Sequence, residues 1–248
     1  MFEQDDVMES SPMSELDAFL EAGWITGKSW VVKSGKEATV YCCEATPGSG
    51  HSYLAAKVYR AHRSFRNDTM YREGRVILSS RIRRAVEKKT NTGREAMSAL
   101  WQGHEYEQLK RLHAVGADVP RPLAMGKNAL LMEYLGEPGA PAPPLQSVRL
   151  ERREARELFQ RLVENLQLML SCNLIHADLS PFNILYWEGR LCIIDFPQAI
   201  DPRFSPHAWE LLHRDLQNVC RYFERQGIRT DVERLAGDLW TGFQFATL

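Results

Sequence analysis

Three polar residues in the second half of the chain could hold a divalent metal ion beside a phosphorylated substrate. Asp178 and Asn183 lie in one short segment, Ile175-His-Ala-Asp-Leu-Ser-Pro-Phe-Asn-Ile-Leu185, and Asp195 follows the apolar run Cys192-Ile-Ile194. A buried strand normally avoids ending in a carboxylate unless something binds that carboxylate. Carboxylate and amide oxygens are the ligands that Mg²⁺ prefers, together with several waters. The spacing therefore indicates a metal-dependent site.

Phosphoryl transfer explains why these residue types would occur together. One carboxylate must orient the attacking oxygen, and a second carboxylate with an amide oxygen must hold Mg²⁺ against the triphosphate. Asp178 suits the first role, and Asn183 and Asp195 suit the second. Each residue alone could cap a helix or a turn, but the joint pattern H-x-D-x-x-x-x-N, then an apolar strand and D-F, favours phosphoryl transfer. His176 is expected to be a hydrogen-bonded packing residue rather than a base.

Lys57 lies in the middle of the apolar segment Leu54–Tyr59. A charge there is costly unless it is paired, although the side chain could also extend to solvent from the outer face of a strand. Phosphoryl transfer needs a lysine for the phosphates and a glutamate that fixes this lysine. Glu105 is the expected partner and Glu107 is the rival, and either could be a surface charge.

The turn Ser34-Gly-Lys36 separates the first two expected strands. Exposed backbone N–H groups in such a turn can bind phosphate. The segment contains one glycine, so an ordinary hairpin turn would look the same.

Hydrophobic patterns predict an α+β fold in two lobes, with strands first and helices later. Strands are expected at Val31–Lys33, Thr39–Glu44, Tyr53–Tyr59 and Ala129–Leu135, the first three as an antiparallel meander. Helices are expected from Ser14 to Gly23 and at Glu95–Val115, Glu151–Ser171, Pro206–Gln226 and Asp231–Phe243, with a hairpin formed by Ile184–Tyr186 and Leu191–Ile194.

Changes in composition divide the chain into a disordered tail at 1–13, an N-lobe at 14–135, a proline-rich linker at 136–144 and a C-lobe at 145–248. Within the N-lobe, basic residues far outnumber acidic ones at 60–94, and the weak periodicity there predicts a partly mobile segment.

The overall composition gives no reason to expect nucleic acid or membrane as a partner, because the formal net charge is −1. Five cysteines without a metal or disulfide spacing favour a reducing compartment. The N-terminus lacks a signal-peptide layout, and no apolar run approaches the roughly 18–20 residues of a membrane span. A cytoplasmic protein is therefore expected.

Taken together, the motifs resemble the RIO family of atypical serine/threonine protein kinases, in a bacterial-type form without the winged-helix domain. The resemblance covers about residues 30–225 and is carried by Ser34–Tyr41, Lys57–Arg60, Leu100–Leu112, Ile175–Leu185, Ile193–Gln198 and His207–Phe223. It implies a trimmed kinase fold with an antiparallel N-lobe sheet, one main N-lobe helix and a mostly helical C-lobe. It also implies ATP with Mg²⁺ or Mn²⁺, and kinase activity on protein or chiefly on the chain itself, or ATPase activity.

The resemblance also implies roles for individual residues. Lys57 would bind the α- and β-phosphates and Glu105 would position it, while Ser34 and Lys36 would line the phosphate turn. Backbone groups of Glu133 and Leu135 would meet adenine. Asp178 would be the catalytic carboxylate, Asn183 and Asp195 the metal ligands, and Asp195 also a candidate phosphate acceptor.

Departures from ordinary protein kinases weaken the expectation of efficient peptide phosphorylation in trans. Ala177 and Ser180 stand where those kinases carry Arg and Lys, Asp-Phe-Pro replaces Asp-Phe-Gly, and no Ala-Pro-Glu segment follows.

Two alternatives remain. A small-molecule kinase of the aminoglycoside or choline type also uses a His-x-Asp loop and a metal-binding aspartate. An ATP-gated binding module is the other alternative, because the basic segment 60–94 could contact phosphate backbones. The resemblance to RIO proteins implies ribosomal RNA or the ribosome as the partner.

Overall fold

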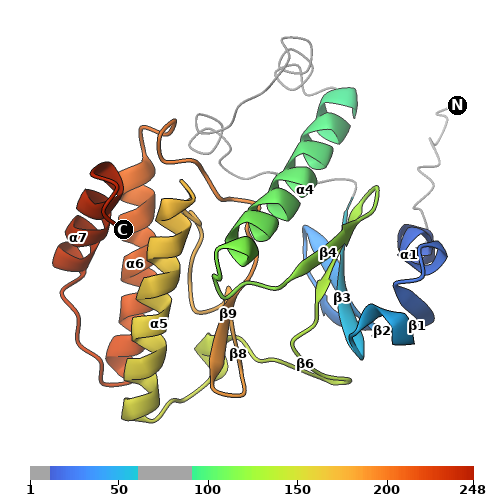
Figure 1. Cartoon of the computed structure of the whole chain (residues 1–248), viewed down its shortest axis with the longest axis horizontal. Coiled ribbons are helices and arrows are strands. Elements are labelled where there is room, and N and C mark those ends of the chain that lie inside the picture. The colour runs from blue at the N-terminus through green and yellow to red at the C-terminus, as the bar shows by residue number, and fades with distance from the viewer. Residues whose placement is uncertain (1–11, 61–90) are drawn as a thin grey trace, which may run out of the picture.

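The computed structural model describes residues 12–60 and 91–248. Most of the expected tail and most of the basic segment 60–94 lie outside the described residues. Figure 1 shows a sheet with one flanking helix at one end of the molecule, a bundle of helices at the other end, and the long helix α4 (Asn91–Ala114) between them. The expected α+β architecture, with strands first and helices later, is present.

Five antiparallel strands form the sheet, in the order β1-β2-β3-β5-β4. The predicted meander corresponds to β1, β2 and β3, and β1 is much longer than predicted. The strand after Pro120 was missed, because Pro122 was taken as a break. A proline is tolerated as the first residue of an edge strand. The strand bounds are β1 Ile25–Ser34, β2 Ala38–Ala45, β3 Tyr53–Tyr59, β4 Pro122–Met125 and β5 Ala129–Glu133.

The two faces of the sheet are covered by different helices, as the alternation of side chains along a strand requires. Helix α1 (Pro12–Glu21) buries Leu16 and Phe19 against one face, where Val58 and Leu131 also point. The neighbouring residues Tyr59 and Leu130 point to the other face and join the main core with α4. The site-bearing strand β3 is therefore buried on both sides.

The second half of the chain packs helices around one hairpin. Its elements are η2 (Leu145–Ser147), α5 (Arg152–Ser171), β8 (Ile184–Trp187), β9 (Arg190–Ile193), α6 (Ala208–Arg225) and α7 (Val232–Gln244). The predicted stripe of leucines on α5, Leu158, Leu162, Leu166 and Leu170, is buried. In Figure 1, α5, α6 and α7 lie side by side, with the β8–β9 hairpin toward the sheet.

The expected linker at 136–144 contains a small hairpin of β6 (Gly136–Glu137) and β7 (Ala140–Pro141). Gly136 has a φ of +121°, and a Cβ at this position would lie 2.6 Å from the backbone N of Ala142. Only glycine fits there. The preceding strand ends at Glu133 rather than at Leu135, so Tyr134 and Leu135 connect the strand to the hairpin. The lobe boundaries themselves stay predictions.

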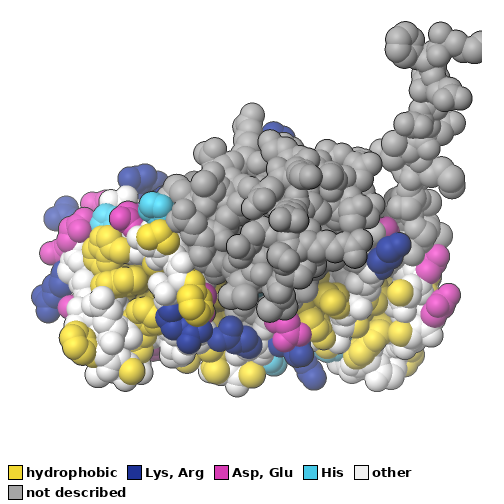
Figure 2. Space-filling model, turned by 90° about the horizontal axis from the view of Figure 1, so that it is seen from above, with side chains coloured by type: hydrophobic (Ala, Val, Ile, Leu, Met, Phe, Trp, Pro, Cys, Tyr) yellow, Lys and Arg dark blue, Asp and Glu magenta, His cyan; other side chains and the backbone are white. Residues whose placement is uncertain are grey.

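The surface mixes side chains of different kinds. Figure 2 shows hydrophobic, basic and acidic side chains interspersed over the described part of one face. Within residues 12–60 and 91–248, every helix is too short or too polar to cross a bilayer.

A partly buried polar cluster joins the segment after α4 to α5. Asn165 is fully buried, accepts a hydrogen bond from Asp118 N (2.6 Å) and donates one to Asp118 Oδ2 (2.7 Å). Arg161 donates to the same carboxylate from its Nε at 2.6 Å. Because the backbone N–H of Ile193 also donates to Asp118 O (2.8 Å), the cluster fixes the strand that precedes the expected metal ligand Asp195.

Replacing Asn165 with leucine removes its two hydrogen bonds with Asp118 and a third to Arg161 O (2.8 Å), and it leaves the backbone N–H of Asp118 without this partner. We expect the free energy of unfolding to fall by about 2 kcal/mol in urea titrations. Arg153→Ala is the matched control on the same helix, because Arg153 is exposed and pairs with Glu157 across one turn. Equal stability of the Asn165→Leu variant and the control would contradict this account of the cluster.

Candidate active site

Lys57 bridges two carboxylates from different parts of the chain. Its Nζ lies 2.7 Å from Glu105 Oε1 on α4 and 2.7 Å from Asp195 Oδ1, which follows β9. Lys57 is 8% exposed and Glu105 is 2% exposed. Burial by itself would lower the pKa of Lys57, but the carboxylates of Asp195 and Glu105 outweigh it and raise the pKa. The lysine is therefore a fixed positive charge.

The structure places Glu105, and not Glu107, on this lysine. A second hydrogen bond joins Lys57 Nζ to Glu105 Oε2 (3.0 Å), and the Tyr59 hydroxyl donates to the same oxygen at 2.5 Å. Glu107 points outward, with 59% of its side chain exposed, and pairs with Lys110. Lys57 and Tyr59 are two residues apart on β3, so both side chains reach the face covered by α4.

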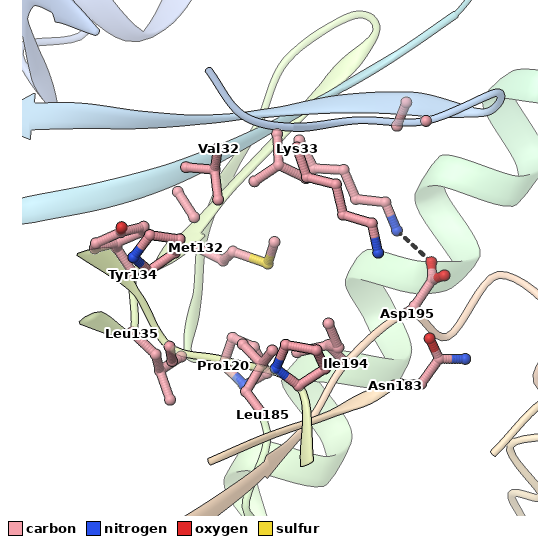
Figure 3. Close-up of a pocket in the computed structure, with 18 of the residues that line it drawn as sticks. Val32, Lys33, Pro120, Met132, Tyr134, Leu135, Asn183, Leu185, Ile194 and Asp195 are labelled. Carbon is pink, nitrogen blue, oxygen red and sulfur yellow. Dashed lines mark hydrogen bonds and ion pairs between the residues drawn. The ribbon is translucent and has the colours of Figure 1, made fainter. Parts of the chain in front are cut away.

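Asp195 has an unusual backbone conformation, with a φ of +71°. This left-handed region is rarely used by non-glycine residues. The residue before it is held on both sides, because Ile194 N donates to Asn183 O (2.9 Å) and His176 Nε2 lies 3.0 Å from Ile194 O. Figure 3 shows the Asp195 side chain at the pocket, and its Oδ1 pairs there with Lys57 Nζ at 2.7 Å.

Asn183 has its amide oriented by Asp178. Its Nδ2 donates to the backbone oxygen of Asp178 at 2.9 Å and lies 3.5 Å from Asp178 Oδ2. The NH₂ group therefore points to the loop. The amide oxygen is the atom that can bind a ligand in the pocket, which Asn183 lines. Asp178 is exposed and lies beside the pocket rather than among its lining residues. Partial desolvation, reinforced by Asp195 and opposed by His176, raises the pKa of Asp178.

His176 is a packing residue, as expected. It is 1% exposed, its ring lies 4.8 Å from that of Phe196, and its Nε2 must donate to the carbonyl of Ile194. Among the described residues, Nδ1 has no hydrogen-bond partner. Desolvation lowers the pKa of His176. The neutral ring thus supports the backbone before Asp195.

Asp215 on α6 holds the Asp178 loop and was missed by sequence reasoning. Its carboxylate is 1% exposed and accepts from Ala177 N at 2.7 Å and from Leu179 N at 3.0 Å, the residues on either side of Asp178. Ala177 has a φ of +62°, and Arg214 donates to its carbonyl. The sequence signal that could have identified Asp215 is a carboxylate on the apolar face of a predicted helix.

A pocket of about 510 Å³ lies between the sheet and the C-terminal half. Apolar side chains line much of its wall, and Lys57 with its partners Glu105 and Asp195 lies at one end together with Asn183. Figure 3 shows Met132, Tyr134 and Leu135 at the opposite end from Asp195. Glu133 and Leu135, expected to meet adenine, both line the pocket, and so does Lys36. The pocket thus has an apolar end for a flat ring and a charged end for an anion.

Ser34, like Asp178, is an expected site residue that does not line the pocket. Its Oγ lies 3.2 Å from Thr39 Oγ1 and accepts a hydrogen bond from Arg60 at 2.8 Å. Gly35 and Lys36 of the same turn do line the pocket. The turn therefore faces the pocket through its last two residues.

The oxygen donors at the charged end suit Mg²⁺. Among the described residues, no group of three or more His, Cys, Asp and Glu side chains is placed to hold a metal. Mg²⁺ commonly takes one or two protein ligands and completes its shell with water and substrate phosphates. The carboxylate of Asp195 and the amide oxygen of Asn183 provide such a pair.

Comparison with known proteins gives consistent matches. The RIO domain family model matches residues 39–235. Serine/threonine-protein kinase RIO1 of Caenorhabditis elegans is 33% identical over 90% of this chain and 42% of its own length. RIO-type serine/threonine-protein kinase Rio1 of Haloferax volcanii is 30% identical over 94% of this chain and 75% of its own. The chain thus spans about two fifths of the length of the nematode relative.

A solved structure supports the fold. The Rio2 kinase from Chaetomium thermophilum, in an ADP/Mg²⁺-phosphoaspartate complex, matches with a TM-score of 0.62 at 20% identity. The match covers 90% of this chain and 64% of the Rio2 chain.

The pairing of Lys57 gives a stability prediction with a matched control. Glu105→Gln leaves a buried lysine with one carboxylate fewer, and we expect the free energy of unfolding to fall by about 2–3 kcal/mol at pH 7. Glu107→Gln alters only an exposed pair on the same helix, and we expect no measurable change. Urea titrations in which both variants match the wild type would show that the buried pair does not stabilise the fold.

Asp215 gives a prediction on pH. Desolvation raises its pKa in the folded chain to about 8, against an unfolded value of about 3.9. Between these two values the native state keeps a proton that the unfolded state has lost, so this residue's stabilisation is lost as the pH rises. The stability of the wild type relative to Asp215→Asn should therefore decline from about pH 5 to about pH 7.5. A difference that stays constant over this range, measured by urea titration, would contradict a raised pKa.

Proposed function

Because the chain belongs to the RIO family, we propose that it is an ATP- and Mg²⁺-dependent serine/threonine protein kinase of the RIO type. The observation that carries the proposal is the position of Lys57, held between Glu105 and Asp195 at the charged end of the pocket. A fixed lysine beside a metal-binding carboxylate is the arrangement that phosphoryl transfer from a nucleotide requires.

The nucleotide would lie along the pocket from its apolar end to its charged end. Adenine fits between the apolar side chains, where Val40, Ala55, Met132, Leu185 and Ile194 line the pocket. The backbone at Glu133 and Leu135 supplies the polar groups that a purine edge needs. The phosphates then lie toward Lys57 and Lys36.

Asn183 and Asp195 would hold Mg²⁺, which neutralises the phosphates when it is bound; Mn²⁺ prefers similar oxygen ligands. Asp195 is paired with Lys57 in this structure, so metal binding requires its carboxylate to be shared or released. Glu105 keeps Lys57 in place meanwhile, because its two oxygens both contact Nζ.

Asp178 would orient the hydroxyl that attacks. The hydroxyl oxygen of a serine or threonine forms a bond to the γ-phosphorus, the bond to the β-phosphate oxygen breaks, and ADP leaves. The hydroxyl proton passes to the Asp178 carboxylate. The raised pKa of Asp178 favours its acceptance of this proton. The acceptor is a protein or the chain itself.

Asp195 is a second candidate acceptor. Its side chain is 42% exposed and faces the phosphate end of the pocket, and the similar Rio2 kinase structure contains a phosphoaspartate. A carboxylate oxygen of Asp195 would form the bond to the γ-phosphorus as ADP leaves, giving an acyl phosphate. Attack by water on that phosphorus would restore the carboxylate and release phosphate, which amounts to ATPase activity.

The two alternative functions have less support. A small-molecule kinase is not favoured by the relatives that match, whose names are those of protein kinases. A contact with ribosomal RNA would depend on the segment 60–94, of which the structure describes only Arg60 and the start of α4. This contact stays a prediction.

Incubation with γ-labelled ATP and Mg²⁺, followed by mass spectrometry of the chain, tests the proposal. The wild type should release labelled phosphate or acquire a phosphate on serine, threonine or aspartate. Asp178→Asn should reduce transfer to hydroxyl groups by roughly 10²- to 10⁴-fold. Asp195→Asn should abolish both phosphate transfer and phosphate release, because it removes the negatively charged metal ligand and the candidate acceptor carboxylate. Asp238→Asn, an exposed carboxylate on α7, is the control and should match the wild type.

Unchanged turnover in both Asp178→Asn and Asp195→Asn would overturn the proposed function. Transfer only to a metabolite, and never to protein or Asp195, would favour the small-molecule alternative instead.

A further inference from the structure

We propose that Lys33 on β1 is an additional phosphate contact. The phosphates of a bound nucleotide would then be contacted by β1, by the turn at 34–36 and by Lys57. The proposal rests on the proposed function and names a further specificity-determining residue of the same pocket. Four observations support it: the register of β1, the polarity of the pocket, the charge at its phosphate end, and the contrast with Lys28 on the same strand.

A β-bulge turns Lys33 toward the pocket. Val31 is opposite Tyr41 on β2 and Lys33 is opposite the next residue, Val40, so Val32 is an extra residue in β1. In a regular strand, neighbouring side chains point to opposite faces, and a bulge breaks this alternation and re-aims a side chain. Val32 and Lys33 consequently both line the pocket.

Val32 and Lys33 extend toward opposite ends of the pocket. In Figure 3, Val32 lies above the apolar end, near Met132, while the long side chain of Lys33 extends toward the end that contains Asp195. Asn183 is labelled at the same end. A ring bound at the apolar end would thus direct its phosphate chain toward the ammonium group of Lys33.

The balance of charges at the Asp195 end of the pocket leaves a bound triphosphate in need of a further positive charge. The single positive charge of Lys57 is already matched by the carboxylates of Glu105 and Asp195, and Glu37 also lines the pocket. A bound triphosphate adds further negative charge, which Mg²⁺ neutralises in part. Lys33 lines the same pocket and extends toward this end, so it would add positive charge beside the phosphates.

Lys28 lies on the same strand as Lys33 but has different surroundings. Its Nζ pairs with Glu44 on the neighbouring strand β2 at 3.4 Å, and it does not line the pocket. Among the contacts between described residues, no carboxylate pairs with Lys33. Because the Lys33 side chain is exposed and long, it can follow the phosphates when they bind. Lys28 is therefore a matched control with the same charge on the same strand.

Isothermal titration of the whole chain with adenosine, ADP and ATP tests the proposal. Without Mg²⁺, Lys33→Met should raise the dissociation constants of ATP and ADP roughly 5- to 20-fold, as expected for one partly exposed charge-assisted contact. Adenosine should bind Lys33→Met as it binds the wild type, because it has no phosphate. Lys33→Arg should retain most of the affinity, and Lys28→Met should match the wild type throughout. Mg²⁺ should reduce the loss without removing it.

The outcomes separate this inference from the proposed function. ATP binding that is unchanged in Lys33→Met would overturn the role of Lys33 alone, and so would an equal loss for adenosine and ATP. A wild type that binds none of the three ligands would overturn the proposed function and this inference together.

Discussion

The buried ammonium group of Lys57 is the constraint on which the site depends. A charged side chain in the middle of a strand covered on both faces is costly unless it is paired. Its two partners come from α4 and from the segment after β9. The fold must therefore bring the sheet, the long helix and the C-terminal half to one point, and this point is the charged end of the pocket.

Several buried residues of the C-terminal half hold the site loops in the position that this pairing requires. Asp215 holds the backbone on both sides of Asp178, and His176 supports the carbonyl before Asp195. Two non-glycine residues, Ala177 and Asp195, have left-handed backbone conformations next to these contacts. Such conformations persist only where their surroundings impose them. The buried groups thus fix the loops on which the exposed Asp178 and the pocket-facing Asp195 lie.

Sequence reasoning identified the fold class because hydrophobic periodicity follows secondary structure directly. The stripe on α5 and the strand Tyr53–Tyr59 were both visible as patterns. It also named Glu105 as the expected partner of Lys57 and Glu107 as the rival, because a mid-strand lysine requires a carboxylate from the next helix, and the structure separates the two. It missed Asp215, whose importance depends on backbone N–H groups far away in the chain. It missed β4, because a proline at the start of an edge strand looks like a break, and it could not detect the bulge that turns Lys33 inward, since register depends on the neighbouring strand.

A crystal structure of the chain with Mg²⁺ and a non-hydrolysable ATP analogue tests the central claim most directly. The account predicts that Lys57 Nζ keeps its contact with Glu105 and contacts a phosphate oxygen, with Asn183 and Asp195 on the metal. A nucleotide bound elsewhere, or a Lys57 that has left Glu105 to face solvent, would contradict it.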